Sequence, residues 1–507
     1  MHALSRREFL HIAALGALGT VCSPRESRAA LQPNIVLIMC DDLGYGDTGF
    51  NGNTVIRTPH LDALCGEGAR FTRFYAGGPV CSPTRGTCLT GRHYARYGIM
   101  NANSGFLPEP EITIAEMCRG LGYRTGHFGK WHLGTLTKTE KDGNRGGKAD
   151  EANVFSPPQQ HGFDVCFSTE SKVPTWDPAI TPAEGKKNLW GEPGSPWTTA
   201  FWNERGERVT DNLAGDDSRV IVDRVEPFIR QTVADQKPFL SVVWFHTPHA
   251  PVVAGPEYRA MYAQYPESQQ HYYGSITAMD EQVGRLNAVL KELGVDQNTI
   301  VFFCSDNGPE GYGDGDLETR NQGSAGKLRG RKRSLFCGGV GVPALVKWPG
   351  VVTPGATLSM PCSTLDYFPT LAEAVGYTMP DARPLDGVNL RGLFTGTMSE
   401  RLSPIPFFFQ SPKKYMFDSP TLGLIDNRYA FLSNLSEDRA EDCCFDLVND
   451  PSETKNLIAD MQPFADASRA RLAAFVESSR RSHSGADYSE PFQPSTPFPL
   501  LTGTWPG

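Results

Sequence analysis

The sequence lacks an uninterrupted apolar segment of the roughly 20 residues that a transmembrane helix needs. It also lacks short repeats, although it contains 52 glycines and 39 prolines, so these residues indicate many turns and long ordered loops. We therefore expect no membrane span and no repeat architecture. With 507 residues, of which 39% are hydrophobic and 21% charged, the chain has the composition of a globular enzyme and the length of two domains.

Paired cysteine motifs are missing as well. The 12 cysteines form neither CxxC pairs nor zinc-ligand clusters, which argues against a structural zinc site and assigns no disulfide framework. Cys40, Cys118 and Cys304 lie in apolar runs, where an unpaired cysteine behaves as a small hydrophobic residue. Cys443 and Cys444 are adjacent, and we expect no bridge between them.

An excess of positive charge is also absent. The chain has 48 Lys and Arg against 57 Asp and Glu, a net charge of -9. Residues 1–29 carry four Arg and two Glu, a net +2, so the remainder has -9 minus 2, or -11. This charge disfavours nucleic acid and anionic membranes as partners. An anionic substrate would need positive side chains gathered at one place.

Residues 1–29 have the pattern of an export signal. Paired arginines precede Phe-Leu, the apolar run IAALGALGTV follows, and Ser27 and Ala29 have the spacing of a signal-peptidase site. The paired arginines resemble a twin-arginine signal, which exports folded proteins. We therefore predict a periplasmic or extracellular protein. Lipoprotein anchoring through Cys22 is disfavoured, because Val21 is a poor residue before a lipidated cysteine.

Buried strands alternate with amphipathic helices along the chain. The apolar segments 34–40, 238–246 and 299–305 predict buried strands. Residues 276–294 have apolar side chains at three- and four-residue spacing and end at Gly294, which predicts a helix. This alternation favours an α/β fold with a large, mainly parallel sheet between helices.

Two of these predicted strands end in adjacent acid or amide residues. Asp41 and Asp42 follow the first strand, and Asp306 and Asn307 follow the third. Either pair alone is typical of a turn. Because ligands bind beyond the carboxyl ends of parallel strands, the two pairs together predict convergence on a cation. Their hard oxygen atoms suit Ca²⁺ or Mg²⁺ rather than zinc or copper, and we favour Ca²⁺.

The segment CSPTRGTCLTGR at 81–92 leaves several roles open for Cys81. The thiol could be a nucleophile, half of a disulfide, a soft-metal ligand or a core residue. A thiol is a poor ligand for a hard cation. The phosphatase signature with five residues between cysteine and arginine also fails, because three residues separate Cys81 from Arg85. Beside such a cation, residue 81 fits better as an oxygen nucleophile than as sulfur.

The segment resembles the signature of the type I, formylglycine-dependent sulfatases of the alkaline-phosphatase-like superfamily. That signature is C-x-P-x-R followed by a leucine-threonine-glycine element. The resemblance covers nearly the whole chain after residue 30, through DDLGYGD at 41–47, TPHLDAL at 58–64, GHFGKWHLG at 126–134, HGFD at 161–164, PHAP at 248–251, SDNGPE at 305–310, LRGRKRSL at 328–335 and FDLVNDPSETKNL at 445–457.

The resemblance implies hydrolysis of sulfate esters at a Ca²⁺ site. It implies that a formylglycine-generating enzyme oxidises Cys81 to formylglycine (3-oxoalanine). The hydrated aldehyde carries two hydroxyls on one carbon. One attacks sulfur, and deprotonation of the other expels sulfate and restores the aldehyde, so one difficult step becomes two easier ones. Residue 81 would thereby join Asp41, Asp42, Asp306 and Asn307 as a metal ligand.

The resemblance also assigns the positive groups. Arg85 would orient the deprotonated hydrate, and Lys332 would supply a second lysine at the sulfate. Lys130 and His132 would lie at the sulfate and the formylglycine, pointing to one side if that segment is extended. His249 would contact sulfate or act as the acid toward the leaving oxygen. Fixed cations aimed at developing charge are the usual source of rate in such sites.

The chain departs from the family at two positions. The family often has Glu and Arg where this chain has Cys337 and Gly341, which puts the charge network near Lys332 in doubt. The family also has a serine or threonine at the active centre after HGFD. Here Ser168, Thr169 and Ser171 are alternatives that the sequence leaves open.

The resemblance also implies a domain division. We predict a catalytic α/β domain over 30–395 and a smaller α+β domain over 396–507, with an antiparallel sheet and a helix at 462–479. The loop-rich region 170–210 carries four tryptophans. Their indole faces suit a sugar ring, although packing of the loops is an equal alternative. Those tryptophans are Trp176, Trp190, Trp197 and Trp202.

Three classes of function are compatible with these motifs. An exported, arylsulfatase-like sulfuric ester hydrolase is favoured, with a sulfated carbohydrate or a small sulfate ester as substrate. A phosphodiester or phosphonate ester hydrolase of the same superfamily is the second hypothesis. The third is a non-catalytic carbohydrate-binding relative, in which Cys81 would remain a thiol. The complete set of nucleophile, cation ligands and basic residues argues against the third.

Overall fold

The computed structural model describes residues 32–499 apart from 144–153, 184–190, 312–318, 411–417 and the single positions 491, 493 and 495. Contacts divide the chain into Met1–Gln32 and Pro33–Gly507, and the fold described below is that of the second unit. The predicted export signal lies outside the described residues, so it stays a prediction.

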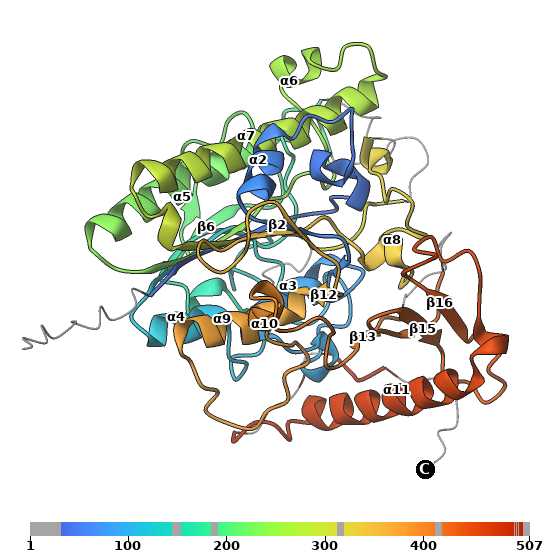
Figure 1. Cartoon of the computed structure of the whole chain (residues 1–507). Coiled ribbons are helices and arrows are strands. Elements are labelled where there is room, and N and C mark those ends of the chain that lie inside the picture. The colour runs from blue at the N-terminus through green and yellow to red at the C-terminus, as the bar shows by residue number, and fades with distance from the viewer. Residues whose placement is uncertain are drawn as a thin grey trace, which may run out of the picture. The chain divides into compact units, whose positions relative to one another are not determined.

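A ten-stranded sheet forms the centre of this unit (Figure 1). Its strands are β1 (Asn34–Cys40), β2 (Ala69–Phe71), β4 (Arg124–Lys130), β5 (Val165–Thr169), β6 (Phe201–Asn203), β7 (Arg208–Val209), β8 (Phe239–Trp244), β9 (Thr299–Ser305), β10 (Leu345–Lys347) and β11 (Ala356–Leu358). Their order is β11-β2-β10-β9-β1-β8-β4-β5-β6-β7. The central strands β9, β1, β8, β4 and β5 are parallel, whereas β10, β6 and β7 run antiparallel to their neighbours.

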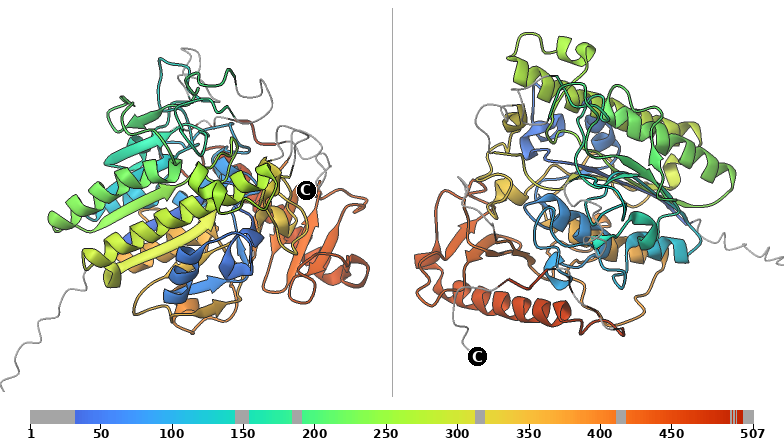
Figure 2. Two further views of the ribbon diagram at one scale, coloured as in Figure 1. Left: turned by 90° about the horizontal axis from the view of Figure 1, so that it is seen from above. Right: turned by 180° about the vertical axis from the view of Figure 1, so that it is seen from behind.

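Helices cover both faces of this sheet (Figures 1 and 2). One face carries α2 (Pro59–Glu67), α5 (Asp217–Ala234) and α7 (Glu267–Glu292). The other face carries α3 (Cys81–Thr90), α4 (Ile114–Gly120), α9 (Tyr367–Val375) and α10 (Arg391–Phe394). Within the described residues, none of the helices combines the length and apolar character that a bilayer crossing requires.

The first strand shows why the sequence gives this layered fold. Ile35, Leu37 and Met39 pack in the core that includes α4 and α9, whereas Val36 and Ile38 pack with α5 and α7. Since side chains alternate between the two faces of a strand, a strand covered on both sides must be apolar throughout. The prediction of a large, mainly parallel sheet between helices is confirmed.

A smaller antiparallel sheet follows in the chain. It contains β13 (Ile405–Phe408), β14 (Leu422–Ile425), β15 (Tyr429–Ser433) and β16 (Cys443–Asp446) in that order. The helix α11 (Gln462–His483) packs on one face through Leu472 and Val476, as Figure 1 shows. The other face packs against Phe336 and the short helix α8 (Cys337–Val340). The predicted α+β character is confirmed, and the boundary at 395 stays a prediction.

The described cysteines form no disulfide. All 11 of them are unpaired, and ten are buried. Cys40 and Cys304 lie in the central strands β1 and β9 with no exposed surface. Burial raises the pKa of Cys40 well above its usual range, so this thiol is protonated and serves as a packing residue.

Candidate active site

The two acid and amide pairs meet at one edge of the central sheet. β1 and β9 are parallel neighbours with Cys40 opposite Ser305, so the residues that follow them leave the sheet side by side. The backbone N–H of Asp42 donates to Asp306 Oδ1 at 3.2 Å. The side-chain amide of Asn307 donates to Asp42 Oδ1 at 2.7 Å. Asp41 accompanies them, and all four side chains are buried.

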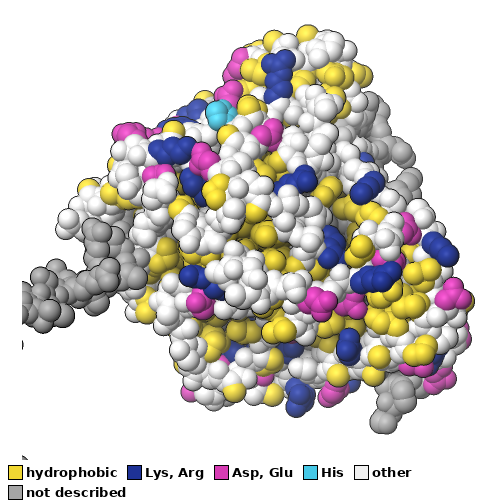
Figure 3. Space-filling view, viewed as in Figure 1, with side chains coloured by type: hydrophobic (Ala, Val, Ile, Leu, Met, Phe, Trp, Pro, Cys, Tyr) yellow, Lys and Arg dark blue, Asp and Glu magenta, His cyan; other side chains and the backbone are white. Residues whose placement is uncertain are grey.

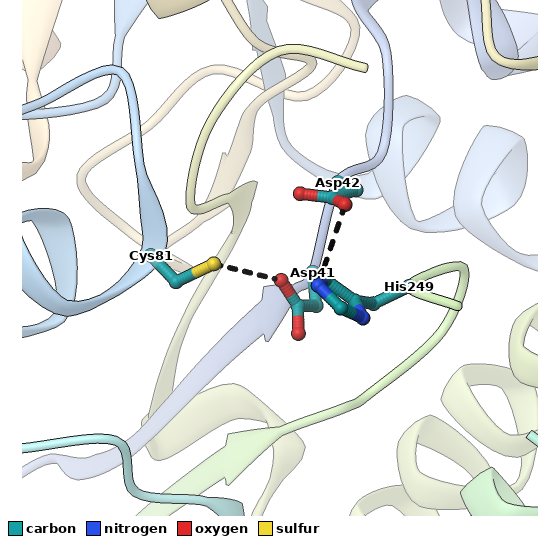
Figure 4. A group of neighbouring side chains, drawn as sticks. All are labelled: Asp41, Asp42, Cys81 and His249. Carbon is teal, nitrogen blue, oxygen red and sulfur yellow. Dashed lines mark hydrogen bonds and ion pairs between the residues drawn. The ribbon is translucent and has the colours of Figure 1, made fainter. Parts of the chain in front are cut away.

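The cysteine lies at the first turn of α3, beside this cluster. Cys81 Sγ is 3.3 Å from Asp41 Oδ1, as Figure 4 shows. Pro83 stands in the first helical turn, where a missing backbone N–H is tolerated. Arg85 follows Cys81 by four positions, so both side chains lie on one face of the helix. The spacing of the C-x-P-x-R motif therefore reflects one helical turn aimed at the cluster.

Arg85 connects three elements of the site. Its Nε and Nη2 donate to Asp306 Oδ2 at 3.1 Å and 2.7 Å, and its Nη1 donates to the carbonyl oxygen of Lys130 at 2.9 Å. The guanidinium is fully buried and lies over the ring of Trp244. Because the planar guanidinium donates hydrogen bonds both to Asp306 and to the backbone of Lys130, it fixes the positions of α3, β4 and β9 relative to one another.

Two lysines contact the carboxylates of this cluster. Lys130, at the end of β4, places Nζ 2.6 Å from Asp41 Oδ2. Lys332 Nζ donates to Asp42 Oδ1 and lies 3.5 Å from Cys81 Sγ. The sulfur of Cys81 is thus close to the ammonium group of Lys332 and to the carboxylate of Asp41, which itself pairs with Lys130.

The ring of His249 also faces this group (Figure 4). Its Nδ1 lies 2.8 Å from the carbonyl oxygen of Ala250, and a hydrogen bond there puts the proton on Nδ1. This leaves Nε2 on the side of Asp42, 3.7 Å from Oδ2. The histidine therefore presents its second nitrogen to the site.

Several ionisable side chains in the site have pKa values shifted from their usual range. Burial alone would raise the pKa of Asp41, but Lys130 and His249 help to outweigh it and hold that pKa well below its usual range. Burial and the carboxylate of Asp41 raise the pKa of Asp306. Burial, together with Asp306 and Asp41, raises the pKa of the Cys81 thiol to about 12. As a thiol, this side chain is protonated at neutral pH.

The donor set fits a hard divalent cation. Asp42 Oδ2 and Asn307 Oδ1 are buried and accept no hydrogen bond. Burying such oxygens costs free energy unless a donor or a cation contacts them. Three carboxylates and an amide oxygen in contact supply the ligand type that Ca²⁺ and Mg²⁺ prefer. Ligand atoms of Asp41, Asp42, Cys81 and His249 also lie within 4.8 Å of one another.

Comparison with known proteins agrees with this geometry. The sulfatase family profile matches residues 33–377. The chain is 32% identical to arylsulfatase A from Bos taurus over 473 residues, which cover 85% of this chain and 84% of that protein. The chain belongs to the sulfatase family. A second profile, described as the C-terminal part of N-sulphoglucosamine sulphohydrolase, matches residues 330–477 of the sulfatase.

Two further relatives extend the comparison. The sulfatase is 30% identical to N-acetylgalactosamine-6-sulfatase from Sus scrofa over 439 residues, 83% of this chain and 75% of that protein. It also resembles the crystal structure of Ps i-CgsB in complex with k-i-k-neocarrahexaose. That match has a TM-score of 0.72 and 25% identity over 90% of this chain and 95% of the other. The sulfatase is a sulfuric ester hydrolase of type I with an alkaline-phosphatase-like fold.

The structure changes the argument for His132. β4 ends at Lys130, and His132 has a φ of +57°, so the segment is not extended and strand alternation does not apply. The ring nitrogen Nε2 lies 2.5 Å from Asn103 Oδ1. The assignment of His132 to the sulfate therefore stays a prediction from the family motif.

The three hydroxyl alternatives separate in the structure. Ser168 Oγ lies 2.7 Å from His127 Nδ1. Thr169 Oγ1 donates to the carbonyl oxygen of Ser171 at 2.8 Å and lies 2.7 Å from His246 Nε2. These two hydroxyls are used within the fold. The choice among Ser168, Thr169 and Ser171 for the hydroxyl near the active centre stays a prediction.

Sequence reasoning missed a buried chain of side chains behind Ser171. Asp217 Oδ2 lies 2.8 Å from His246 Nδ1, and His246 in turn contacts Thr169. All three side chains are fully buried, so they position the backbone that carries Ser171. No sequence signal pairs them, because Asp217 begins α5, Thr169 ends β5 and His246 follows β8.

The loop after β9 supplies an acid near Lys332. Glu310, within SDNGPE, is buried, and its carboxylate pairs with Arg320 and with Arg333. Burial alone would raise the pKa of Glu310, but Lys332 and Arg320, with Arg333, lower it to about 2. Negative charge beside Lys332 is therefore retained. The effect of Cys337 and Gly341 on this charge network stays a prediction.

Of the two alternatives for the tryptophans, packing of the loops holds for two of the four. Trp197 and Trp202 are 8% and 4% exposed. Their Nε1 atoms donate to the carbonyl oxygen of Lys172 at 3.0 Å and to Asp142 Oδ2 at 2.8 Å. Both pack the loops, because an indole with a buried hydrogen-bond partner is a core residue. Trp176 is half-buried, and Trp190 lies outside the described residues.

Proposed function

We propose that this sulfatase removes sulfate from carbohydrates, with formylglycine formed from Cys81 as its nucleophile and Ca²⁺ as its metal. The observation that supports this most directly is the contact of residue 81 with both a carboxylate and an ammonium group. Cys81 Sγ lies 3.3 Å from Asp41 Oδ1 and 3.5 Å from Lys332 Nζ. A residue placed between metal ligands and anion-binding cations is where a nucleophile would meet a sulfate ester.

We assign the metal to Asp41, Asp42, Asp306 and Asn307, with the oxygen of formylglycine 81 as a further ligand. The fit is supported by the buried oxygens of Asp42 and Asn307 that accept no hydrogen bond. Bound there, Ca²⁺ would supply Lewis-acid chemistry by holding sulfate oxygens and favouring the ionised nucleophile. Mg²⁺ is less suited, because it demands a tighter octahedral shell.

The positive side chains of this chain would bind and orient the ester. Lys130 and Lys332 each pair with a different carboxylate of the cluster, so they are fixed before substrate binds. Fixed charges need no reorganisation when charge develops on the sulfate. Arg85 would hold the residue 81 hydroxylate, and His132 would contact the sulfate.

His249 is assigned to the leaving group. Its Nδ1 contacts the carbonyl oxygen of Ala250, which fixes the ring with Nε2 toward the site. We propose that His249 acts as an imidazolium with Nε2–H at the bridging oxygen. The departing alkoxide would take the proton from Nε2, and the ring would return to its neutral form with the remaining proton on Nδ1, bonded to the carbonyl oxygen of Ala250. Ser171 would line the same pocket, since the chain from Asp217 through His246 holds its backbone.

A carbohydrate substrate is supported by two relatives and by one loop. One relative is named for N-acetylgalactosamine 6-sulfate, and one structure contains a neocarrahexaose. In this chain Thr175 Oγ1 donates to the carbonyl oxygen of Val253 at 2.6 Å, which joins the Trp176 loop to the segment after His249. Trp176 would therefore form a wall for a sugar ring.

Export and maturation complete the proposal. A twin-arginine signal at 1–29 would deliver the folded protein to the periplasm or beyond, after a formylglycine-generating enzyme has read the extended segment at Cys81. The division into a catalytic domain over 30–395 and a smaller domain over 396–507 belongs to the same proposal. The last residue of α10, Phe394, packs with the large sheet, and β13 begins the small one.

Paired esters of a single leaving group test this function. The matured protein is assayed with 4-nitrophenyl sulfate, the corresponding phosphate diester and a phosphonate monoester, and then with defined sulfated saccharides. We expect sulfate esters to have the highest kcat/KM and saccharides to exceed the aryl sulfate. A preference for the phosphate diester or phosphonate would identify the second hypothesis instead. Saccharide binding without turnover would identify the third, if Cys81 remains a thiol in protein produced with a formylglycine-generating enzyme.

A further inference from the structure

A cavity of about 410 Å³ is lined by residues other than those assigned to catalysis. It is formed by the loop after β1, the segment from β2 to β3 (Phe74–Tyr75), the segment around α8, and the end of β16. None of its lining residues belongs to the site described above. They are Tyr45, Arg70, Thr72, Arg73, Phe74, Tyr75, Lys327, Leu328, Cys337, Gly341, Ser359, Leu447, Val448 and Pro451.

The lining is positively charged. It contains Arg70, Arg73 and Lys327 and no Asp or Glu. Acidic and basic side chains are otherwise intermixed on the molecular face in Figure 3, and the whole chain has more acidic than basic residues. Three cations around one cavity without a carboxylate create a local field that favours an anion.

The two arginines are held in place by neutral partners. Arg70 donates from Nη1 to the carbonyl oxygen of Phe50 at 3.0 Å and from Nε to Thr357 Oγ1 at 3.3 Å. Arg73 donates to the carbonyl oxygens of Ser359 and Asn427, both at 2.6 Å. Carbonyl and hydroxyl oxygens orient a guanidinium without cancelling its charge.

None of the three cations forms an ion pair with a carboxylate in the part of the chain that the structure describes. The ion pairs there involve other arginines and lysines, such as Arg92 with Glu111 and Lys347 with Glu67. Lys327 is exposed. Its charge is therefore available at the cavity.

Two small buried residues, Cys337 and Gly341, are part of the lining. Such small residues leave space for a ligand. A Cβ atom at Gly341 would lie 2.6 Å from the carbonyl oxygen of Cys337. The backbone of this chain is thus built for a small residue there.

The buried carboxyl of Glu453, which is bonded to the backbone of Cys337, does not offset the positive charge of the lining. Glu453 Oε2 accepts a hydrogen bond from the backbone N–H of Cys337 at 2.7 Å. Burial raises the pKa of Glu453 to about 8, so this group is largely neutral at pH 7. The lining also includes the apolar side chains of Leu447, Pro451 and Val448, and Val448 is 57% exposed.

We propose that this cavity is a second binding site, for a sulfate or carboxylate group carried on a sugar unit of a polysaccharide. Arg70, Arg73 and Lys327 would bind the anionic group, and the wall formed by Leu447 and Val448 would contact the apolar face of the ring. The cavity has the volume of a small-molecule site. The choice of a saccharide as carrier rests on the proposed function, whereas the preference for an anion does not.

Binding is tested on full-length protein carrying Cys81→Ala, so that turnover cannot consume the probe. The probe is a fluorescently labelled, fully sulfated heparin hexasaccharide, followed by anisotropy at low salt. Lys327→Ala removes one cation, and Val448→Trp fills the cavity without changing its charge. We expect each to weaken binding about tenfold, the size of one lost charge-assisted contact.

Lys237→Ala is the matched control, because Lys237 is exposed and does not line the cavity. Its affinity should stay within about twofold of the parent protein. Equal affinities for the parent, Lys327→Ala and Val448→Trp proteins would overturn the proposal. If Val448→Trp does not fold, Ser359→Trp fills the cavity from the exposed rim. Turnover of 4-nitrophenyl sulfate by the unmodified enzyme tests the proposed function separately.

Discussion

Arg85 donates two hydrogen bonds to one carboxylate oxygen of Asp306, from Nε at 3.1 Å and from Nη2 at 2.7 Å. Neither side chain has any exposed surface. The two residues come from α3 and from the end of β9, 221 positions apart. This pair therefore joins the helix that carries residue 81 to the strand end that carries Asp306 and Asn307, two of the proposed metal ligands.

Arg85→Lys should reduce activity and stability together. Lysine keeps the charge but cannot reach Asp306 and the Lys130 carbonyl with a planar fork. We expect kcat/KM for an aryl sulfate to fall by about 10²-fold or more, as for loss of a fixed donor at developing charge. Arg124→Lys, at a half-exposed pair with Asp235, is the control. Unchanged kinetics in Arg85→Lys would contradict the assigned role.

Protein produced with a formylglycine-generating enzyme should be lighter at residue 81. Replacement of the thiol by an aldehyde lowers the mass of the peptide by about 18 Da. The second cysteine of the same segment, Cys88, is fully buried in α3 and should keep its mass, which makes it an internal control. Full activity in protein that contains only the thiol at 81 would rule out the mechanism.

Calcium should stabilise the fold through the oxygen cluster. A ligand that binds only the native state raises the free energy of unfolding with its concentration, so Ca²⁺ should raise the Tm of chelator-treated protein. Asp42→Asn should reduce that increase, because Asp42 Oδ2 lies in the cluster and accepts no hydrogen bond. Asp235→Asn, at an exposed position, should respond like the parent. A Ca²⁺ effect that survives Asp42→Asn would place the ion elsewhere.

Trp176→Ala and Trp202→Ala should have different consequences. Trp176 is half-buried, and loss of its ring should lower kcat/KM for a sulfated oligosaccharide several-fold while sparing an aryl sulfate, since stacking contributes about 1 kcal/mol. Trp202 is 4% exposed and bonded to Asp142. Its truncation should lower the free energy of unfolding by about 3–5 kcal/mol. Equal losses on both substrates for Trp176→Ala would indicate a folding role.

Glu453→Gln should make stability less dependent on pH. Burial raises the pKa of Glu453 from 4.5 to about 8, so between these values the folded state holds a proton that the unfolded chain has lost. This contribution to stability is full below pH 4.5 and is lost as pH rises toward 8. The glutamine variant should therefore gain on the order of 2–4 kcal/mol relative to the parent at about pH 8 compared with about pH 5.

Thermal unfolding across that pH range measures the effect of Glu453. Glu477→Gln, on the exposed side of α11, serves as the control and should follow the parent curve. Parallel curves for Glu453→Gln and the parent would show that this carboxyl is already ionised in the folded protein.

Local sequence determined much of the fold. The segments 34–40 and 299–305 were predicted as strands and are β1 and β9, because a strand buried on both faces must be apolar at every position. The helix predicted at 276–294 overlaps α7, which begins earlier, at Glu267, and ends at Glu292. Its first turns were not predicted, because they contain polar residues that tertiary contacts hold in the helix.

Sequence also determined the composition of the site. The four-residue spacing of Cys81 and Arg85 is one helical turn, and Asp41 and Asp306 each follow an apolar strand. These relations are local, so short motifs record them. Chain topology then brings the strand ends together, because β1 and β9 are parallel neighbours.

Only the tertiary structure decided which polar and aromatic side chains are buried and what they contact. Trp197 and Trp202 are core residues, Glu310 stays ionised among Lys332, Arg320 and Arg333, and Glu453 reaches Cys337 across 116 positions. No local pattern encodes such contacts, because the partners are distant in sequence and their pairing depends on the whole fold. The cavity over Cys337 and Gly341 has the same origin: two small residues leave space only because the surrounding elements are already fixed.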